Sequence, residues 1–484
     1  MTQSNVISRA QAATVLLLLA CLSAGGCLVG PDFSRPAAAV PDEWLGEPNA
    51  PTTRPAEAQA EVKLQVWWAV FDDPNLTSLV EQAFESNLDL QIATVRIRQA
   101  RASRGMTASG VGPTVDASGS YRRSQTGSGT PTVNRYQTGF DAGWEIDLFG
   151  GVRRGVEAAD AQLQAAIEYR RDVLVTLAAE VARSYIDLRT YQQRIAIAKR
   201  NLESQKRSAQ LTKKRFDSGF VSGLDVANAE ALVASTQGQI PLLESSAAQT
   251  VYSLSVLLGR APGALMAELS ETGAIPPSPP AVPVGVPSDL LRRRPDIRQA
   301  EANIHAATAN IGVATADLYP KVTIAGSIGF SAANSGDLFN PLSRFWSFGP
   351  SVTWNVFQSG RTLSNIELQK ALEAESILAY RSTVLSAVQE VESALVASAK
   401  EQEHRKSLLA SVAANRKAAD LATQLYTEGE TDFLNVLSAQ RSLYTSEDSL
   451  VQSTQTVSVN LIALYKALGG GWEQAQGDAD RQGR

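Results

Sequence analysis

Residues 215–226 read Arg-Phe-Asp-Ser-Gly-Phe-Val-Ser-Gly-Leu-Asp-Val, and residues 425–436 read Leu-Tyr-Thr-Glu-Gly-Glu-Thr-Asp-Phe-Leu-Asn-Val. In both stretches a Gly among polar residues predicts a reversal of the chain. Residues 156–218 and 361–428, which lead up to the reversals, contain neither Gly nor Pro, so each can form one unbroken helix. At about 1.5 Å per residue, each helix would be a rod of roughly 90 to 100 Å, which a globular domain could not contain.

The two reversals belong to a longer repetition. Residues 87–119 align without a gap with residues 294–326 at an offset of 207, and Leu258-Gly259 aligns with Leu468-Gly469 at an offset of 210. A period of this length is too long for a solenoid unit and indicates the duplication of a half-molecule. We therefore expect a first structural repeat at 61–274, a Pro-rich linker at 275–287, a second repeat at 288–470 and a disordered polar tail at 471–484.

Both repeats predict the same order of elements. A helix comes first, at about 75–109 with a possible break near Asn87, and at 288–318. Two strands follow, near 113–123 and 136–149 in the first repeat and near 320–332 and 345–357 in the second. Apolar residues alternate with more polar ones from Val322 to Phe330, which is the pattern of a strand with one apolar face. The long helix and a return helix complete each repeat, and apolar residues spaced by three and four from Leu174 to Leu202 indicate a coiled-coil seam.

The N-terminus has the order of a secretory signal, with Arg9 ahead of an apolar run at 12–20 and small residues before Cys27. Cys27 resembles a lipoprotein processing site, so we expect a signal peptide at 1–26, an acylated Cys27 and an extended Pro-rich lead at 27–60. Cys21, which follows Leu-Leu-Ala, is an alternative acylation site, and an ordinary cleaved signal with incidental cysteines is another interpretation. The sequence has no further cysteines, which excludes a disulfide framework.

Composition and motifs exclude several function classes. The formal net charge of −5 argues against nucleic acid as a partner. No phosphate loop, nucleophile elbow or His-Glu-x-x-His motif is present, so we expect no enzyme activity and no cofactor or metal. We interpret His305 and His404 as incidental, Trp67 and Trp68 as packing anchors, and residues 292–294 (Arg-Arg-Arg) as partners in salt bridges.

The strands limit how the chain could cross a membrane. Behind the signal no stretch approaches the roughly 18 apolar residues that a spanning helix needs, so a membrane crossing would use strands. Four strands cannot close on themselves, and lipid does not tolerate an open edge. Two chains would give a closed eight-strand sheet with a filled interior, whereas three would give twelve strands and a lumen. A channel therefore predicts a trimer, and a secreted coiled-coil structural protein is the alternative.

Several motifs resemble one family. Residues 66–76 (Val-Trp-Trp-Ala-Val-Phe-Asp-Asp-Pro-Asn-Leu), 290–301, 316–320, 215–226 and 434–443 are similar to the outer-membrane efflux lipoproteins of the TolC/NodT (OprM-like) type. The resemblance implies a mainly α protein whose long helices form a trimeric α-barrel in the periplasm. Four strands per chain would contribute to a shared twelve-strand outer-membrane β-barrel.

The same resemblance implies a function and partners. The homotrimer would be the passive exit duct of a tripartite efflux system, lipid-anchored in the outer membrane. It would carry drugs or other small solutes delivered by an inner-membrane pump and a periplasmic adaptor protein. A conduit for type I protein secretion shares that structure and remains an alternative.

The resemblance also places functional residues at the two reversals. The periplasmic gate of the family falls on Asp225, Tyr426, Thr431, Asn435 and Ser438. The adaptor-contacting turns fall on Arg215, Gly219, Ser222, Leu224, Gly429 and Leu434.

Three of the gate positions depart from the family pattern. Thr431 stands where the family has a latch arginine, and Asn435 and Ser438 stand where some members have carboxylates. A bond between Asp225 and Tyr426 would then be a hydrogen bond worth about 1 kcal/mol. We expect a gate that is less cation-selective and less tightly latched, unless Asp420 or Asp432 supplies the charge.

Overall fold

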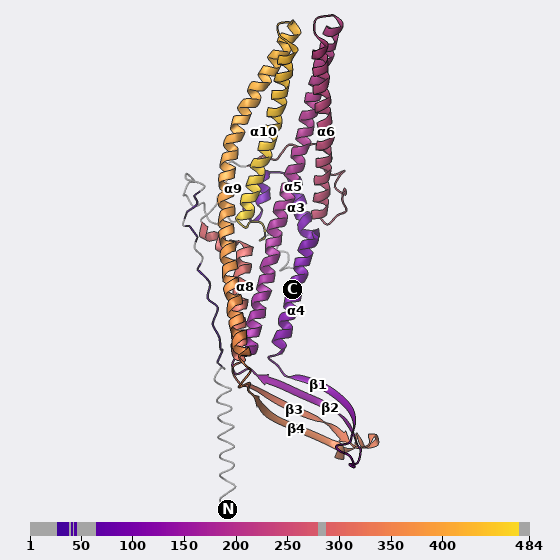
Figure 1. The fold of residues 1–484 in the computed structure, drawn as a ribbon, viewed down its shortest axis with the longest axis vertical. Coiled ribbons are helices and arrows are strands. Elements are labelled where there is room, and N and C mark those ends of the chain that lie inside the picture. Colours follow the sequence, from indigo (N-terminus) through magenta and orange to yellow (C-terminus); the bar gives the residue numbers. More distant parts are fainter. Residues whose placement is uncertain (1–26, 38–39, 42, 46–63, 279–286, 474–484) are drawn as a thin grey trace, which may run out of the picture. The chain divides into compact units, whose positions relative to one another are not determined.

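The computed structural model describes residues 27–37, 40–41, 43–45, 64–278 and 287–473 (Figure 1). The predicted signal peptide with Cys21, part of the Pro-rich lead, most of the linker and residues 474–484 lie outside this set. The chain forms two compact units. Unit 1 holds the described residues of Met1–Ala37, Val95–Ile167 and Gln299–Ser382, and unit 2 holds those of Ala38–Thr94, Glu168–Arg298 and Thr383–Arg484. Each unit thus combines segments of both sequence repeats.

The helices confirm the predicted duplication. The main helices are α3 (Pro74–Ser86), α4 (Leu88–Ser109), α5 (Gly151–Asp217), α6 (Gly223–Leu257), α7 (Leu290–Arg293), α8 (Pro295–Ala316), α9 (Arg361–Glu428) and α10 (Phe433–Ala467). Both ends of α8 lie 207 residues after those of α4, and both ends of α10 lie 210 residues after those of α6. The first rod begins earlier than expected, because α5 continues through Gly155. Among the described residues, none of the helices is both long and apolar enough to cross a membrane.

Each return helix ends against a break in another helix. The predicted break at Asn87 is confirmed: this residue separates α3 from α4, and its side-chain amide donates to the carbonyl oxygen of Leu257 at 2.8 Å. The unbroken helix expected at 288–318 is wrong, because Pro295 disfavours helical geometry at Arg294 and separates α7 from α8. Arg294 donates through Nη1 to the carbonyl oxygen of Ala467 at 2.9 Å. The two breaks therefore cap the C-terminal ends of α6 and α10.

Arg294 is also the centre of an ion cluster. Its buried guanidinium pairs with Asp296 and with Glu390, each at 2.7 Å. Burial lowers the pKa of Arg294, but the bonds with Asp296 and Glu390 raise it by more, so the side chain stays charged. The expected salt-bridging role is confirmed for this residue.

The two tryptophans are packing anchors, as predicted. Trp67 and Trp68 are buried, and Trp67 stacks on Tyr465 of α10 with ring centroids 5.4 Å apart. Residues 471–473, the first three of the tail expected at 471–484, belong to the described chain. Gly471 packs against Trp67, where an added Cβ would lie 3.1 Å from its indole nitrogen. The ring of Trp472 lies 4.5 Å from the guanidinium of Arg171, an attraction that holds this segment in place.

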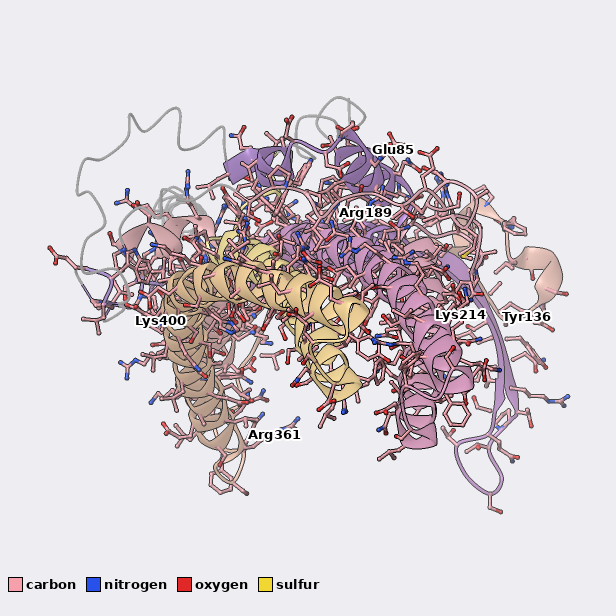
Figure 2. The ribbon with its side chains drawn as sticks, turned by 90° about the horizontal axis from the view of Figure 1, so that it is seen from above. Glu85, Tyr136, Arg189, Lys214, Arg361 and Lys400 are labelled. Carbon is pink, nitrogen blue, oxygen red and sulfur yellow. The ribbon has the colours of Figure 1, made fainter. Side chains whose placement is uncertain are left out.

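The apolar seam of α5 is confirmed, since Leu174, Val181 and Leu188 are buried. Buried polar side chains continue on the same helix. Arg189, labelled in Figure 2, donates to the Tyr185 hydroxyl at 3.0 Å and to the carbonyl oxygen of Glu271 at 2.7 Å. Arg189 thereby holds the segment that follows α6 against α5.

Unit 1 contains a four-stranded antiparallel sheet. The strands β1 (Thr114–Ser124), β2 (Val133–Ile146), β3 (Lys321–Ala332) and β4 (Arg344–Thr353) pair in chain order (Figure 1). The predicted strands are confirmed, although β2 begins and ends three residues earlier than expected and β4 stops four residues before the expected end. Gly139 of β2 faces Gly329 of β3, and a Cβ on Gly329 would lie 2.3 Å from a carbonyl oxygen of β2. These two glycines let the strands of the two repeats approach closely.

The two faces of the sheet differ in chemistry. One row across the strands pairs Phe140 with Ile328 and Ile328 with Trp346, and all three side chains are more than half exposed. The opposite face carries hydrogen-bonded hydroxyls, such as Ser327 with Ser347 at 2.7 Å. The sheet therefore has an exposed apolar face and a polar face.

Replacing Arg294 should weaken the second helix cap. Arg294→Ala leaves the carboxylates of Asp296 and Glu390 and the end of α10 without their cation, so we expect a loss of about 3 kcal/mol in unfolding free energy. Arg292→Ala is the matched control, because Arg292 is exposed and its loss should cost less than about 0.5 kcal/mol. Denaturant unfolding followed by circular dichroism measures both. Equal unfolding free energies of the two variants would show that Arg294 does not stabilise the end of α10.

Candidate functional site at the helix tips

Two helix reversals in unit 2 have the same backbone geometry. At the α5–α6 tip, Gly219 donates to the carbonyl oxygen of Phe216 and Phe220 donates to that of Arg215, both at 2.8 Å. At the α9–α10 tip, Gly429 and Glu430 make the corresponding bonds, at 3.1 and 2.9 Å. Both glycines have a positive φ, +79° and +86°, which other residues rarely adopt. The predicted role of these glycines in the reversals is confirmed.

An apolar cluster lies directly behind the tips. Tyr426, Phe433, Val436 and Leu437 from the α9–α10 pair pack with Ala229 of α6. The rings of Tyr426 and Phe433 lie 5.5 Å apart. The two helical hairpins are therefore packed together at this end of unit 2, where their tips lie side by side (Figure 1).

Arg215 joins the two hairpins. Its guanidinium carbon lies 4.8 Å from the centre of the Tyr426 ring, and its Nη1 donates to the carbonyl oxygen of Tyr426. The Tyr426 hydroxyl in turn donates to Oγ1 of Thr212 at 3.1 Å. Tyr426 lies in the last turn of α9, where the helix dipole favours a cation. Arg215, Thr212 and Tyr426 thus form one polar contact between α5 and α9, which we call the tip contact.

The other predicted gate residues make local bonds instead. The Asp225 carboxylate accepts from the backbone N–H and the hydroxyl of Ser222, at 3.1 and 2.9 Å, and stabilises the start of α6. Thr431 accepts from Asn435 at 2.8 Å within the second tip. Ser438, Leu224 and Leu434 are exposed. The structure therefore brings together Arg215 and Tyr426, whereas Asp225 and Tyr426 bond to other groups.

The tips present different surfaces. Phe216, Phe220 and Leu224 are exposed at the α5–α6 tip, and so are Lys213 and Lys214, the latter labelled in Figure 2. The α9–α10 tip instead exposes the acidic residues Glu428, Glu430 and Asp432. The α5–α6 tip, which also exposes Asp217, therefore combines apolar side chains with charges of both signs, and the α9–α10 tip is acidic.

A buried carboxylate farther along the helices joins three of them. Glu447 of α10 is 5% exposed and accepts from Arg416 of α9 at 2.6 Å, from Arg200 of α5 at 3.0 Å and from Asn201 at 3.2 Å. Burial raises the pKa of Glu447, but the bonds from Arg416 and Arg200 lower it by more, so its pKa lies below the ordinary value. The neighbouring Asp448 forms a two-bond pair with Arg194 of α5, at 2.7 and 3.1 Å.

The sequence did not predict the Glu447 cluster. It also did not predict the roles of Thr212 in the tip contact and of Phe433 in the apolar cluster. The adjacent acidic residues at 447 and 448 were a signal, but their partners Arg194 and Arg200 lie about 250 residues away on α5, and Arg416 lies 31 residues away on α9.

The Glu447 cluster makes stability depend on pH. Glu447→Gln should lower the unfolding free energy by about 1 to 2 kcal/mol at pH 7, a modest loss because both arginines are more than half exposed to solvent. Since the folded pKa is depressed, this contribution is complete above the unfolded value of 4.5 and is lost as the pH falls below it. Unfolding at pH 7 and pH 3.5 measures the change, with the exposed Glu403→Gln as control. If Glu447→Gln lost the same unfolding free energy at both pH values, the ionised Glu447 would not be the source of the stability.

Known proteins share both the sequence and this fold. Residues 79–260 and 286–470 match the family described as outer membrane efflux protein. The chain is 33% identical to nodulation protein T of Rhizobium leguminosarum bv. trifolii, over 92% of this chain and 95% of the relative. It is 31% identical to the probable efflux pump outer membrane protein TtgC of Pseudomonas putida, over 95% of each.

A solved structure of the outer-membrane channel OprN matches with a TM-score of 0.85 and 37% identity, over 92% of this chain and all of that one. The family match covers most of the first repeat and all of the second, and the long helices and four-stranded sheet agree with the fold class expected from the sequence. The chain belongs to the outer membrane efflux protein family.

Proposed function

We propose that three copies of this chain form an outer-membrane channel, the exit duct of a tripartite efflux system. The observation that carries the proposal is the two-faced sheet. Its apolar face exposes Phe140, Ile328 and Trp346, an arrangement that suits lipid, while hydroxyls on the other face suit water. A soluble, secreted coiled-coil protein would gain nothing from such a face.

The sheet edges support the trimer. Within the described residues β1 pairs only with β2, and β4 pairs only with β3. A membrane sheet must close, so β4 of one copy would pair with β1 of the next. Three copies would supply twelve strands and enclose a lumen, whereas two would leave the interior filled by side chains.

The long helices would extend the duct into the periplasm. The chain would contribute a path rather than a reaction, with the energy supplied by an inner-membrane pump. Because a similar protein is named the antibiotic efflux pump outer membrane protein ArpC of Pseudomonas putida, drugs or other small solutes are the favoured cargo. Proteins exported by a type I system are the alternative. The exposed Cys27 would carry the lipid anchor.

The tips are the proposed docking and gating elements. An adaptor protein would meet the apolar α5–α6 tip and the acidic α9–α10 tip with different chemistry at each. The tip contact would hold the α9–α10 hairpin against α5 in the closed state. Arg215 would supply a cation where Thr431 lacks one, but it binds a ring and a carbonyl oxygen rather than a carboxylate, so the gate would be latched only lightly.

Valine at the tip glycines should impair transport more than assembly. Gly219→Val and Gly429→Val each force a β-branched residue into a positive φ, at a cost of about 1 to 3 kcal/mol confined to the tips. In a strain lacking its own efflux duct, we expect both variants to reach the outer membrane as trimers but to restore drug resistance only partly. Full restoration of resistance would refute the docking role. Absence of trimers of the unaltered chain from outer-membrane fractions would refute the proposed function.

A matched pair of alanine variants tests the tip contact. An alanine Cβ at Gly429 would lie 3.2 Å from the guanidinium of Arg215, whereas one at Gly219 meets nothing within 4 Å. Both positions carry the same backbone strain. We therefore expect Gly429→Ala and Arg215→Ala to raise the closed-state conductance of single channels in lipid bilayers, and Gly219→Ala to leave it near that of the unaltered channel.

The same recordings test the light latch. A very small closed conductance that none of these variants changes and that divalent cations block would contradict it. That result would indicate acidic gate residues such as Asp420 or Asp432 instead.

A further inference from the structure

The start of the described chain lies along helix α8 as an extended strap, which we define as residues 28–35. Gly30 touches Gly312, the ring of Phe33 stacks on His305 at 4.5 Å, and Arg35 pairs with Glu301 at 2.7 Å. The strap and α8 run in opposite directions. Five extended residues span about 17 Å and eleven helical residues span about 16 Å, so the two remain in register. His305, expected to be incidental, is part of this contact.

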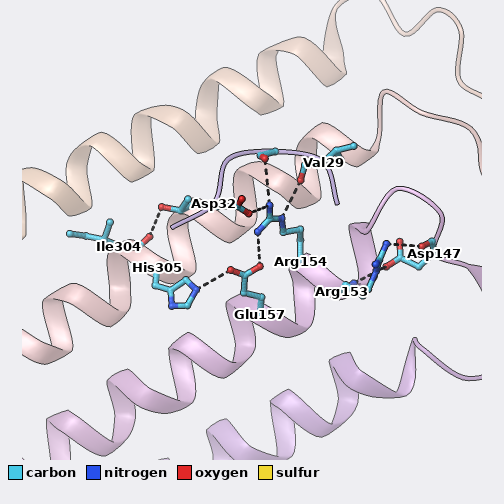
Figure 3. Close-up of polar contacts among 10 residues, drawn as sticks. Val29, Asp32, Asp147, Arg153, Arg154, Glu157, Ile304 and His305 are labelled. Carbon is cyan, nitrogen blue, oxygen red and sulfur yellow. Dashed lines mark hydrogen bonds and ion pairs between the residues drawn. The ribbon is translucent and has the colours of Figure 1, made fainter. Parts of the chain in front are cut away.

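Arg154 of α5 clamps the strap (Figure 3). The side chain is only 2% exposed, and it donates to the carbonyl oxygen of Val29 at 3.1 Å and to the Asp32 carboxylate at 2.6 Å. Its other terminal nitrogen binds Glu157 at 2.8 Å, and Glu157 contacts His305 at 3.0 Å. A buried arginine in contact with two carboxylates satisfies the charge balance that burial demands. One connected network therefore joins the strap, α5 and α8.

The strap and α8 approach so closely at Gly30 and Gly312 that only glycine fits at either position. A Cβ on Gly30 would lie 2.4 Å from the Cα atom of Gly312, and a Cβ on Gly312 would lie 2.7 Å from Cγ of Arg154. Gly30 also has a φ of +90°. The strap, α8 and Arg154 are thus in direct van der Waals contact, a fit that unspecific adhesion of a Pro-rich segment would not require.

The strap ends beside the sheet. The backbone N–H of Val29 donates to the carbonyl oxygen of Phe149 at 3.2 Å, three residues after β2. Phe149 stacks at 4.6 Å on Tyr319, which lies just before β3. Cys27 is exposed and only two residues from the bonded Val29. The cysteine is therefore held at the base of the two central strands.

We propose that the strap and Arg154 form a docking site for the acylated N-terminus, which makes the lipid on Cys27 a fixed anchor at the base of β2 and β3. This inference rests on the acylation included in the proposed function. A lipid on Cys27 would stay within about 7 Å of Val29, because only two residues separate the cysteine from the bonded backbone N–H of Val29. The docked strap would therefore give the lipid on Cys27 a fixed position. Arg154 is a positioning residue, since it acts on the anchor through the strap.

Cleavage by chymotrypsin after Phe33 tests the dock in the purified full-length mature protein. The Phe33 ring must leave His305 before the protease can bind, so cleavage reports how often the strap opens. We expect cleavage at least about 100-fold slower than in a synthetic peptide of residues 27–40. Asp32→Ala and Arg154→Lys should each raise the rate at least about tenfold, after correction with peptides that carry the same strap sequence.

Controls separate the dock from a folding defect. Arg104→Ala removes an exposed ion pair with Asp160 in the same unit and should leave the cleavage rate unchanged. Asp32→Ala alters only the strap, so the helices should retain their circular dichroism. Two results would overturn the proposed docking of the strap. One is cleavage of the native protein as fast as the peptide. The other is an unchanged cleavage rate in both the Asp32→Ala and the Arg154→Lys variants.

The mass of the released fragment tests the acylation independently. A fragment of residues 27–33 that carries the acyl groups supports the fixed anchor. A fragment that begins at Cys21 overturns the selection of Cys27. An unmodified fragment, released as slowly as expected, would refute acylation and the anchor while leaving the docked strap intact.

Discussion

The ends of the two return helices are the constraint on which the rest of unit 2 depends. A helix leaves its last carbonyl groups without internal partners, and buried carbonyls must find donors elsewhere. Asn87 and Arg294, 207 residues apart, supply these donors to α6 and α10. Gly259 and Gly469 make the close approach possible, since a Cβ on Gly259 would lie 2.4 Å from a carbonyl oxygen of α3. The same junction is built twice, once with an amide and once with an ion cluster.

Between these junctions and the tips, polar contacts hold the helices together. Asp448 and Glu447 of α10 bind arginines of α5 and α9, and Gln440 donates to Ser208 at 2.9 Å. Such contacts are directional, so they set the register of α10 on α5 more strictly than apolar packing would. The partly exposed arginines keep each contact weak enough to be exchanged. This combination suits helices that must be aligned and yet be able to separate at one end.

The two repeats have kept their backbone and changed their chemistry. The strands, the rods and the reversals coincide at offsets of 207 to 211 residues. At the tips, however, the exposed Phe220 corresponds to Glu430 and Ser222 to Asp432, so one hairpin exposes an aromatic ring and a hydroxyl where the other exposes carboxylates. A symmetric framework thus carries two unlike tips, which allows one hairpin to move or to bind while the other stays in place.

The elements of this protein and their order could be predicted from the sequence, because they follow from local properties. The glycine-free runs set the rods, the alternation from Val322 to Phe330 set a two-faced strand, and Gly219 and Gly429 set the reversals. Which side chains meet could be seen only once the helices were packed together. Arg215 lies on Tyr426, Glu447 on Arg416 and Arg200, and Arg154 on the strap, and most of these pairs are more than 100 residues apart. Such contacts depend on the rotation and register of packed helices, which no local pattern encodes. For that reason the expected pairing of Asp225 with Tyr426 was replaced by other bonds, and His305 gained a role that its isolated position in the sequence did not indicate.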